Sequence, residues 1–289
     1  MRGALIKSQM YAFLTVVFWS SAYVFTKTAL EFFSVSSLAV LRCLVASLSL
    51  AGVAAFGKMP PPPLSAIPRF LLTGAAGFAF YVLAFNKGSV LLNPTTSCVI
   101  ISTAPIITAL LAYFRFGEKV GAPGVLAMGA AFGGILVMML WNGVMDFSEG
   151  IVWIFGAALL ISIYNILQRD LARRYGALHV TTYSFVAGTI LLLPFLPEAA
   201  VEWSNAPLGQ QALVCFLGVC PSAAAYLLWS KAMAIAPRTG GVANYMFLTP
   251  FFALLLEYAV TGDVPGPETF VGGGVILASL AVFAVSRRS

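Results

Sequence analysis

The sequence predicts an all-α integral membrane protein in which ten transmembrane helices form two inverted five-helix repeats around a central cavity. Composition is the first observation behind this prediction: apolar residues make up 60% of the 289 residues, and charged residues only 9%. A soluble domain carries about 25% charged residues, so this chain could not cover a water-exposed surface. Ten spans of roughly 20 residues leave only connections and tails, so residues 1–289 are expected to form a single transmembrane domain.

Apolar runs between charges, polar turns and Gly/Pro clusters define the spans in chain order. The first run, at 10–30, resembles a signal peptide but is too long and lacks a small-residue cleavage site, so we interpret it as an uncleaved span. The prolines at 60–63 predict a stiff polyproline connection, and 197–209 is the other long connection. The predicted spans are 8–29, 36–57, 68–87, 94–114, 121–141, 150–169, 179–196, 210–232, 239–260 and 269–286.

Charges are distributed unevenly over the connections. Placing both termini in the cytoplasm puts most Lys and Arg on the inner side, as the positive-inside rule requires. The outer side then holds only Lys27 and Lys87, together with most acidic residues. We attribute the net charge of +6 to this bias rather than to nucleic-acid binding. The inner basic residues are Arg2, Lys7, Lys58, Arg69, Arg115, Lys119, Arg169, Arg173, Arg174, Lys231, Arg238, Arg287 and Arg288.

Internal similarity divides the chain into two parts. At an offset of 145 residues Tyr81 matches Tyr226 and Pro105 matches Pro250, and at 142 residues Ser20 matches Ser162. Such an ordered series is typical of an internal repeat. Because each repeat has an odd number of spans, the second is inverted relative to the first, which is a common construction of secondary transporters. The predicted repeats cover approximately 8–141 and 150–286.

The paired prolines, Pro105 and Pro250, both fall near the middle of a span. Each removes a backbone hydrogen bond and bends its helix. Their symmetric positions predict that both are hinge or kink residues. Pro221, in the eighth span, has no matching proline and is given no such role.

Two segments carry a recognisable signature. FRFGEKVGAPGVLAMGAAFGGILVM at 114–138 and LTPFFALLLEYAVTGDVPGPETFVGGGVILASLAVF at 248–283 each lead through a Gly-acidic turn into a Gly-rich helix. With Trp19-Ser20-Ser21 and Arg42, they resemble the EamA branch of the drug/metabolite transporter superfamily, and within it most of all the YddG-type exporters of aromatic amino acids. Asp263 departs from the Glu usual in the repeat. The resemblance implies ten spans in two repeats and export of amino acids.

Enzyme chemistry has no motif to support it. HExxH, GxSxG and P-loop patterns are absent, and His179 is the single histidine. The four cysteines lie in apolar runs without CxxC spacing. We therefore expect no catalytic residue, no metal and no cofactor.

Arg42 and Glu257 are the ionisable residues that lie clearly within spans, where a charge is costly. Both fall within about two turns of a helix end, so snorkelling or a structural ion pair remains open beside a functional role. No carboxylate lies at mid-depth, which favours facilitated diffusion over direct proton coupling. Glu118 and Asp263 are expected at membrane edges in structural roles.

Aromatic and polar side chains inside the spans predict where a solute binds. Several aromatic residues recur at i,i+3 or i,i+4 spacing, and an amide facing lipid is unfavourable. The Gly-rich spans five and ten are expected at the periphery, either packed on each other or in a dimer seam. The predicted wall of the cavity comprises Trp19, Tyr23, Tyr81, Phe85, Ser97, Tyr164, Asn165, Tyr226, Trp229, Asn244 and Tyr245.

These observations favour a secondary transporter that exports aromatic or large neutral amino acids and related amphipathic metabolites by alternating access. Alternatives are an exporter of drugs or lipophilic cations, for which only Glu257 could make the cavity anionic, and a channel or a non-transporting scaffold. The expected location is a bacterial plasma (inner) membrane. The expected partners are a small-molecule substrate and membrane lipid, without nucleic acid, for a monomer or weak homodimer.

Overall fold

The computed structural model describes residues 2–117, 121–141, 148–235 and 244–286, and within these ranges every regular element is a helix, as predicted. The first half of the chain forms α1 (Arg2–Ala29), α2 (Val35–Phe56), η1 (Leu64–Ala66), α3 (Ile67–Gly74), η2 (Ala75–Ala79), α4 (Phe80–Leu91), α5 (Pro94–Ile101), α6 (Ala104–Phe116) and α7 (Ala122–Leu140). The remainder forms α8 (Glu149–Tyr175), α9 (Ala177–Leu192), η3 (Leu193–Phe195), α10 (Leu196–Asn205), α11 (Leu208–Leu217), η4 (Gly218–Ala224), α12 (Ala225–Ile235), η5 (Asn244–Leu248), α14 (Thr249–Thr261) and α15 (Pro267–Ser286).

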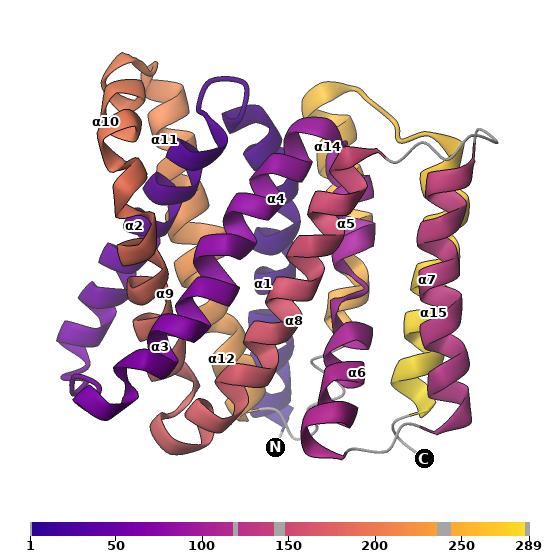
Figure 1. The fold of residues 1–289 in the computed structure, drawn as a ribbon, viewed down its shortest axis with the longest axis horizontal. Coiled ribbons are helices and arrows are strands. Elements are labelled where there is room, and N and C mark those ends of the chain that lie inside the picture. The colour runs from indigo at the N-terminus through magenta and orange to yellow at the C-terminus, as the bar shows by residue number, and fades with distance from the viewer. Residues whose placement is uncertain (1, 118–120, 142–147, 236–243, 287–289) are drawn as a thin grey trace.

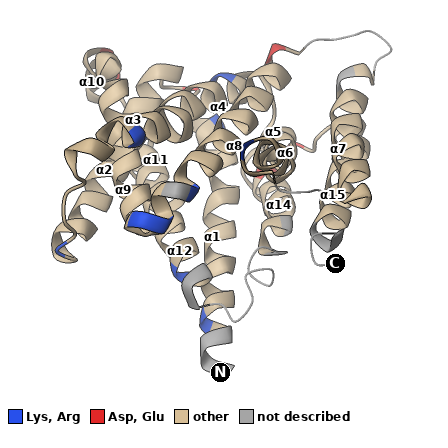
Figure 2. Ribbon diagram, turned by 60° about the horizontal axis from the view of Figure 1, so that its bottom comes forward, with Lys and Arg blue, Asp and Glu red and all other residues tan. Residues whose placement is uncertain are grey.

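Successive spans run in alternating directions through the bundle (Figure 1). The start of α1 and the end of α15 lie at the same end of the molecule, which we call the terminal end. Figure 2 shows the Lys and Arg positions mainly toward this end. The start of α1 and the end of α15 therefore lie on the same side of the bundle, toward which most described Lys and Arg residues lie.

Among the described residues, six helical segments are long and apolar enough to cross a membrane. Shorter apolar helices accompany them at Ala122–Met138, Thr249–Thr261 and Pro267–Phe283. The protein is therefore a multi-pass membrane protein. The six segments are Val35–Phe56, Leu64–Leu91, Pro94–Phe116, Glu149–Arg169, Ala177–Asn205 and Leu208–Ala232.

α1 is as long as these segments but more polar, because hydroxyl side chains recur along it. Thr15, Ser20 and Thr26 are completely buried, so they face other helices rather than lipid. α1 packs against α4, α5, α12, α14 and η4, and Figure 1 shows it in the middle of the bundle. Its polar residues therefore mark the central helix of the fold.

α7 and α15 lie side by side at the edge of the bundle (Figure 1). Their backbones meet at two glycines. A Cβ atom on Gly134 would lie 2.6 Å from the carbonyl oxygen of Gly272, and one on Gly272 would lie 2.5 Å from the carbonyl oxygen of Gly134. Small residues permit such close packing in membranes. Of the two arrangements left open by the sequence, the structure shows the Gly-rich helices packed on each other.

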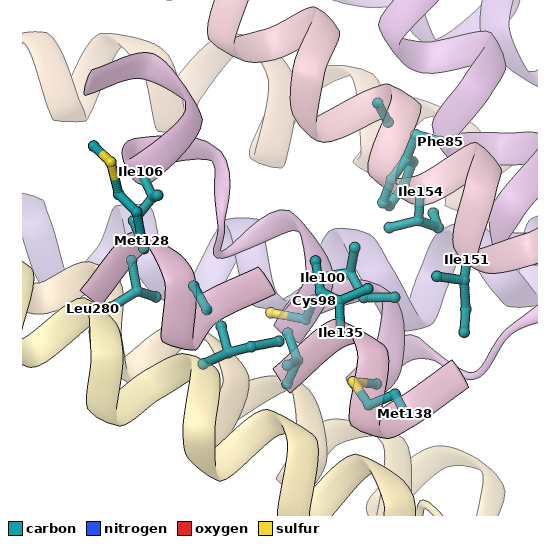
Figure 3. Close-up of a cluster of buried hydrophobic side chains, with 14 of the residues drawn as sticks. Phe85, Cys98, Ile100, Ile106, Met128, Ile135, Met138, Ile151, Ile154 and Leu280 are labelled. Atoms are coloured by element: carbon teal, nitrogen blue, oxygen red, sulfur yellow. The ribbon is translucent and has the colours of Figure 1, made fainter. Parts of the chain in front are cut away.

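A cluster of buried apolar side chains joins this helix pair to the rest of the bundle. Ile135 of α7 lies beside Cys98 and Ile100 of α5 (Figure 3). Ile276 and Leu280 of α15 belong to the same cluster. Apolar packing therefore fixes the position of α7 and α15 against α5.

Both paired prolines lie just after an interruption in a span. α5 ends at Ile101 and α6 begins at Ala104, with Pro105 in its first turn. Pro250 likewise lies in the first turn of α14, after the 3-10 helix η5. Proline suits the first turn because its missing N–H would have no helical partner there. Each proline therefore lies at a joint between consecutive helices, and its role as a hinge stays a prediction.

Two serines contact these joints in equivalent ways. The hydroxyl of Ser20 donates to the carbonyl oxygen of Thr249 at 3.0 Å, and that of Ser162 donates to the carbonyl oxygen of Ala104 at 2.9 Å. Both accepting residues immediately precede a paired proline. In each case a helix from one predicted repeat is bonded to the joint of the other.

π-helical stretches occur in two spans of the described chain, η2 and η4. The offset of 145 residues that aligns Pro105 with Pro250 also aligns the last residues of the two stretches, Ala79 and Ala224. Pro221 lies buried inside η4. Pro221 therefore lies in a stretch whose counterpart, η2, contains no proline. The two stretches match in backbone geometry, which a comparison of prolines does not detect.

The long connection predicted at 197–209 is mostly helical, which corrects that prediction. Pro197 occupies the first turn of α10 and so starts a helix rather than breaking one. Glu202 of α10 accepts a hydrogen bond of 2.9 Å from the N–H of Ser34, where α2 begins. This contact holds α10 against the bundle.

Candidate functional site

Rings from four elements meet in the middle of the bundle. Trp19 of α1 contacts Tyr226 and Trp229 of α12, with ring centroids 5.7 and 5.3 Å apart. Tyr226 also contacts Phe78 of η2 at 5.8 Å and Phe185 of α9 at 5.6 Å. Trp19, Tyr226 and Trp229 each keep part of their surface accessible. The predicted neighbours from α1 and α12 are therefore brought together.

Tyr164 of α8 completes this set. Its buried ring lies 5.1 Å from that of Phe78. A Cβ atom on Gly77 would lie 2.4 Å from the same ring, so the glycine leaves the space that Tyr164 occupies. We call the set the first aromatic group. It comprises Trp19, Phe78, Tyr164, Phe185, Tyr226 and Trp229.

A second aromatic group joins α1 to α4. It consists of Tyr23, Tyr81 and Phe85, with centroids 5.4 Å apart for Tyr23 and Phe85 and 5.9 Å apart for Tyr81 and Phe85. Trp19 of the first group and Tyr23 of the second lie one turn apart on α1, so the two groups are neighbours. Together they supply apolar ring faces with hydroxyl groups between them, which suits an amphipathic solute.

Arg42 of α2 lies beside both groups. Its side chain is 8% exposed, and it lies near enough to Tyr81 and Tyr226 for its charge to act on their hydroxyl groups. Nε donates to the hydroxyl of Ser222 at 3.0 Å, and Nη1 donates to that of Thr26 at 3.4 Å. Among the described residues no carboxylate pairs with it. Within the described part of the chain, Arg42 therefore neither snorkels nor forms an ion pair.

The other predicted wall residues have different surroundings. Ser97 of α5 is 1% exposed, and its hydroxyl has no hydrogen-bond partner in the described part of the chain. Tyr245 and Trp229 both pack against the small cluster formed by Ala12 and Ala232. The backbone of Asn244 begins η5, but its side chain lies outside the described residues.

Asn165 faces a neighbouring helix through its amide. It donates to the hydroxyl of Thr108 on α6 at 3.4 Å and accepts from Gln168 at 3.2 Å. The expectation that this amide avoids lipid agrees with these contacts. Asn165 follows the buried Tyr164 directly, so the polar set borders the first aromatic group.

Glu257 of α14 has a structural partner. It is 1% exposed, and Oε2 accepts hydrogen bonds from both the N–H and the hydroxyl of Thr95, in the first turn of α5. A carboxylate is favourable at a helix N-terminus, where the N–H groups lack partners. Lys27 interacts electrostatically with the same carboxylate. Glu118, the other acidic residue considered with Asp263, lies outside the described residues.

A cavity of about 590 Å³ opens where the ends of α3, α6 and α8 meet. None of the predicted wall residues lines it. Leu167 lines the cavity and also packs in the cluster that contains Tyr164 and Tyr226. The cavity therefore lies directly next to the first aromatic group. Its lining includes Arg69, Thr73, Arg115, Phe116, Arg173 and Arg174.

The cavity carries positive charge from three helices. Arg69, Arg115, Arg173 and Arg174 are all exposed, and the guanidinium of Arg115 lies 5.7 Å from the Phe116 ring. Four guanidinium groups around one cavity attract anions from the adjacent solution. We call this cavity the arginine vestibule.

The aromatic rings and the Arg42 guanidinium are groups that can bind a solute. Among the described residues, no group of three His, Cys, Asp or Glu side chains could hold a metal ion. Sequence reasoning missed Phe78 and Phe185, because a Phe in an apolar run has no distinguishing signal. It also left Arg42 undecided, although a single Arg within a span is a visible signal. The vestibule could not be located because its lining comes from three separated segments.

The comparisons with known proteins identify a family of transporters. The sequence model of the EamA-like transporter family matches this chain twice, over residues 6–140 and 148–285. A probable terminal-alkyne amino-acid exporter of Streptantibioticus cattleyicolor is 30% identical over 96% of this chain and 92% of that protein. The uncharacterized transporter YdfC of Bacillus subtilis is 27% identical over 97% and 92%, respectively. The uncharacterized inner membrane transporter YhbE of Escherichia coli is 26% identical over 96% and 91%.

A solved crystal structure is similar to this fold. It covers 99% of this chain and 100% of its own, with a TM-score of 0.66 and 19% sequence identity. At that identity the likeness concerns the fold alone. The arrangement of helices is thus one that an experimentally determined protein also adopts.

Proposed function

This chain belongs to the EamA-like transporter family, and from that premise we propose that it exports aromatic or large neutral amino acids and related amphipathic metabolites. The proposed transport crosses a bacterial plasma (inner) membrane by alternating access and is uncoupled facilitated diffusion. The relative from Streptantibioticus cattleyicolor, a probable amino-acid exporter, supports this substrate class.

Ten spans in two inverted repeats are part of this proposal. The family model matches the two halves separately, and Ser20 and Ser162 bond to equivalent joints of the opposite halves. Ser47 of α2 and Thr189 of α9, which are 142 residues apart, share a hydrogen bond of 2.8 Å. That separation equals one of the repeat offsets, so equivalent residues meet at a pseudo-symmetry axis. Two halves that can exchange conformations provide alternating access.

The observation that carries the proposal is the central position of the aromatic groups. Trp19 of the first half and Tyr226 of the second are in ring contact, and both keep accessible surface. A solute between them would touch both halves. Its release would then follow from any motion of one half relative to the other.

The proposed orientation places both termini, and hence the arginine vestibule, in the cytoplasm. Arg69, Arg115 and Arg173 would then concentrate carboxylate-bearing solutes at the inner entrance. Export of an amino acid begins with capture on this side. We propose a monomer as the working unit, because the close contact of Gly134 with Gly272 joins α7 to α15 within one chain.

The runner-up, an exporter of lipophilic cations, would need a negatively charged centre. Glu257 is instead bound at the start of α5, and Arg42 places a positive charge beside the aromatic groups. A channel is the other alternative. It would conduct continuously and would show no counterflow.

Counterflow in proteoliposomes tests the proposal. The purified protein is reconstituted, the vesicles are loaded with unlabelled phenylalanine, and uptake of labelled phenylalanine, methionine and threonine is followed at several pH values. We expect saturable, pH-independent exchange that is strongest for phenylalanine. Absence of saturable exchange for every amino acid would exclude the substrate class, and flux without counterflow would favour a channel.

A further inference from the structure

We infer that Arg42 binds the carboxylate group of the transported amino acid, an inference that rests on the export function proposed above. The inference comes from the burial of this side chain, its hydrogen bonds and the rings beside it.

The charge of Arg42 is not compensated by any described residue. Arg42 is the eighth residue of α2, which places it roughly 10 Å along that helix. A guanidinium cannot lose its proton in a protein, so it stays charged at this depth. An isolated charge in a low-dielectric interior is unfavourable unless an opposite charge pairs with it. A carboxylate that enters the site would supply that partner.

The guanidinium is also held in a fixed orientation. Its Nε–H is bonded to Ser222, and one Nη1–H is bonded to Thr26, so α1 and η4 together position the group. The Ser222 hydroxyl donates in turn to the carbonyl oxygen of Leu217 at 2.8 Å, a bond within the π-helical region. Both Nη2–H donors remain without a partner among the described residues. A planar guanidinium with free donors is suited to a carboxylate.

The surrounding rings define the rest of the ligand. Tyr81 and Tyr226, whose hydroxyl groups lie within range of the Arg42 charge, belong to the second and first aromatic groups. A carboxylate at Arg42 therefore places the side chain of an amino acid against ring faces on either side. This combination selects amphipathic acids with large apolar or aromatic side chains, and it opposes organic cations.

Three ligands distinguish the contribution of the carboxylate to binding from that of the rest of the substrate. Phenylalanine carries the ring, the amine and the carboxylate, 3-phenylpropanoate lacks the amine, and phenylalaninamide lacks the carboxylate. Competition of each ligand with labelled phenylalanine is measured in proteoliposomes for the wild type and for Arg42→Gln and Arg42→Lys. Lys231→Gln, which removes an exposed charge from α12, is the matched control.

In the wild type and in Lys231→Gln, phenylalaninamide should compete at least ~10-fold more weakly than phenylalanine. Arg42→Gln should weaken both carboxylates by about 10- to 100-fold, which is typical of a lost charge-assisted hydrogen bond, and should leave phenylalaninamide nearly unchanged. Arg42→Lys should retain a preference for carboxylates at reduced affinity, because it keeps the charge without the planar fork. Thermal melting of the purified variants checks that they fold. If Arg42→Gln does not fold, Arg42→Lys is compared with the wild type instead.

Two results would overturn the inference while leaving the export function intact. One is equal competition by phenylalanine and its amide in the wild type. The other is an equal loss for all three ligands in the folded Arg42 variants, which would give Arg42 a structural role. A wild-type protein that transports no amino acid would instead contradict the proposed function, and the inference with it.

Discussion

The α7–α15 pair and the region around Arg42 differ in how closely their residues pack and in whether their polar groups are paired. At Gly134 and Gly272 the two backbones come so close that neither glycine can carry a side chain. Around Arg42 the structure instead shows a charge without a counter-charge among the described residues, and rings with accessible surface. The first region is closely packed and supports the fold. The second has guanidinium donors and ring faces that can bind a solute.

The largest effect should come from filling the close contact between α7 and α15. Gly134→Val places atoms where the Gly272 carbonyl lies, so the helices must separate, and we expect a loss of about 3 kcal/mol or more. Gly133→Val is the matched control, because a Cβ atom on Gly133 meets nothing within 4 Å. Thermal melting in detergent measures both. Similar melting temperatures for the two variants would mean that the pair is not closely packed.

Loss of a serine contact at the joints should have a smaller effect. Ser20→Ala and Ser162→Ala each remove a buried hydrogen bond to the residue before a paired proline, so each should destabilise the protein by about 1 kcal/mol. The two losses should be similar if the halves are equivalent. Ser204→Ala, on the exposed end of α10, is the control and should change little. Clearly unequal losses would argue against equivalent joints.

The arginine vestibule should affect rate more than stability. Arg115→Gln and Arg173→Gln should each lower the initial rate of phenylalanine uptake from the vestibule side about two- to threefold at low salt, because steering of the carboxylate weakens. The difference from the wild type should shrink at high salt, where exposed charges are screened. Initial rates at two ionic strengths measure this. A salt-independent deficit would contradict steering.

The scaffold was more predictable from sequence than the binding region, for a physical reason. Gly-rich stretches at 129–134 and 272–274 directly indicate close helix packing, and the structure places them on each other. The apolar runs similarly predicted the all-helical membrane class. Pro197 misled the interpretation because proline both breaks helices and starts them, and the first turn of α10 uses the second property.

The binding region depends on contacts between residues that are distant in the chain. Trp19, Tyr226 and Trp229 could be proposed from spacing, but the ring contacts of Phe78 with Phe185 and Tyr226 could not. Arg42 was visible as a charge within a span. Its hydroxyl partners come from α1 and η4, and a π-helical stretch has no sequence signal that would have placed Ser222 beside it.

The central claim is that the rings contributed by both halves bind the transported solute. Saturation kinetics of phenylalanine counterflow in Trp19→Ala test it most directly, with Trp153→Ala, at an exposed position of α8, as the matched control. We expect Trp19→Ala to be inserted normally in the membrane and to raise KM for phenylalanine about tenfold, because loss of aromatic contacts costs roughly 1 kcal/mol or more. Trp153→Ala should leave KM unchanged. An unchanged KM in Trp19→Ala for every transported amino acid would contradict the account.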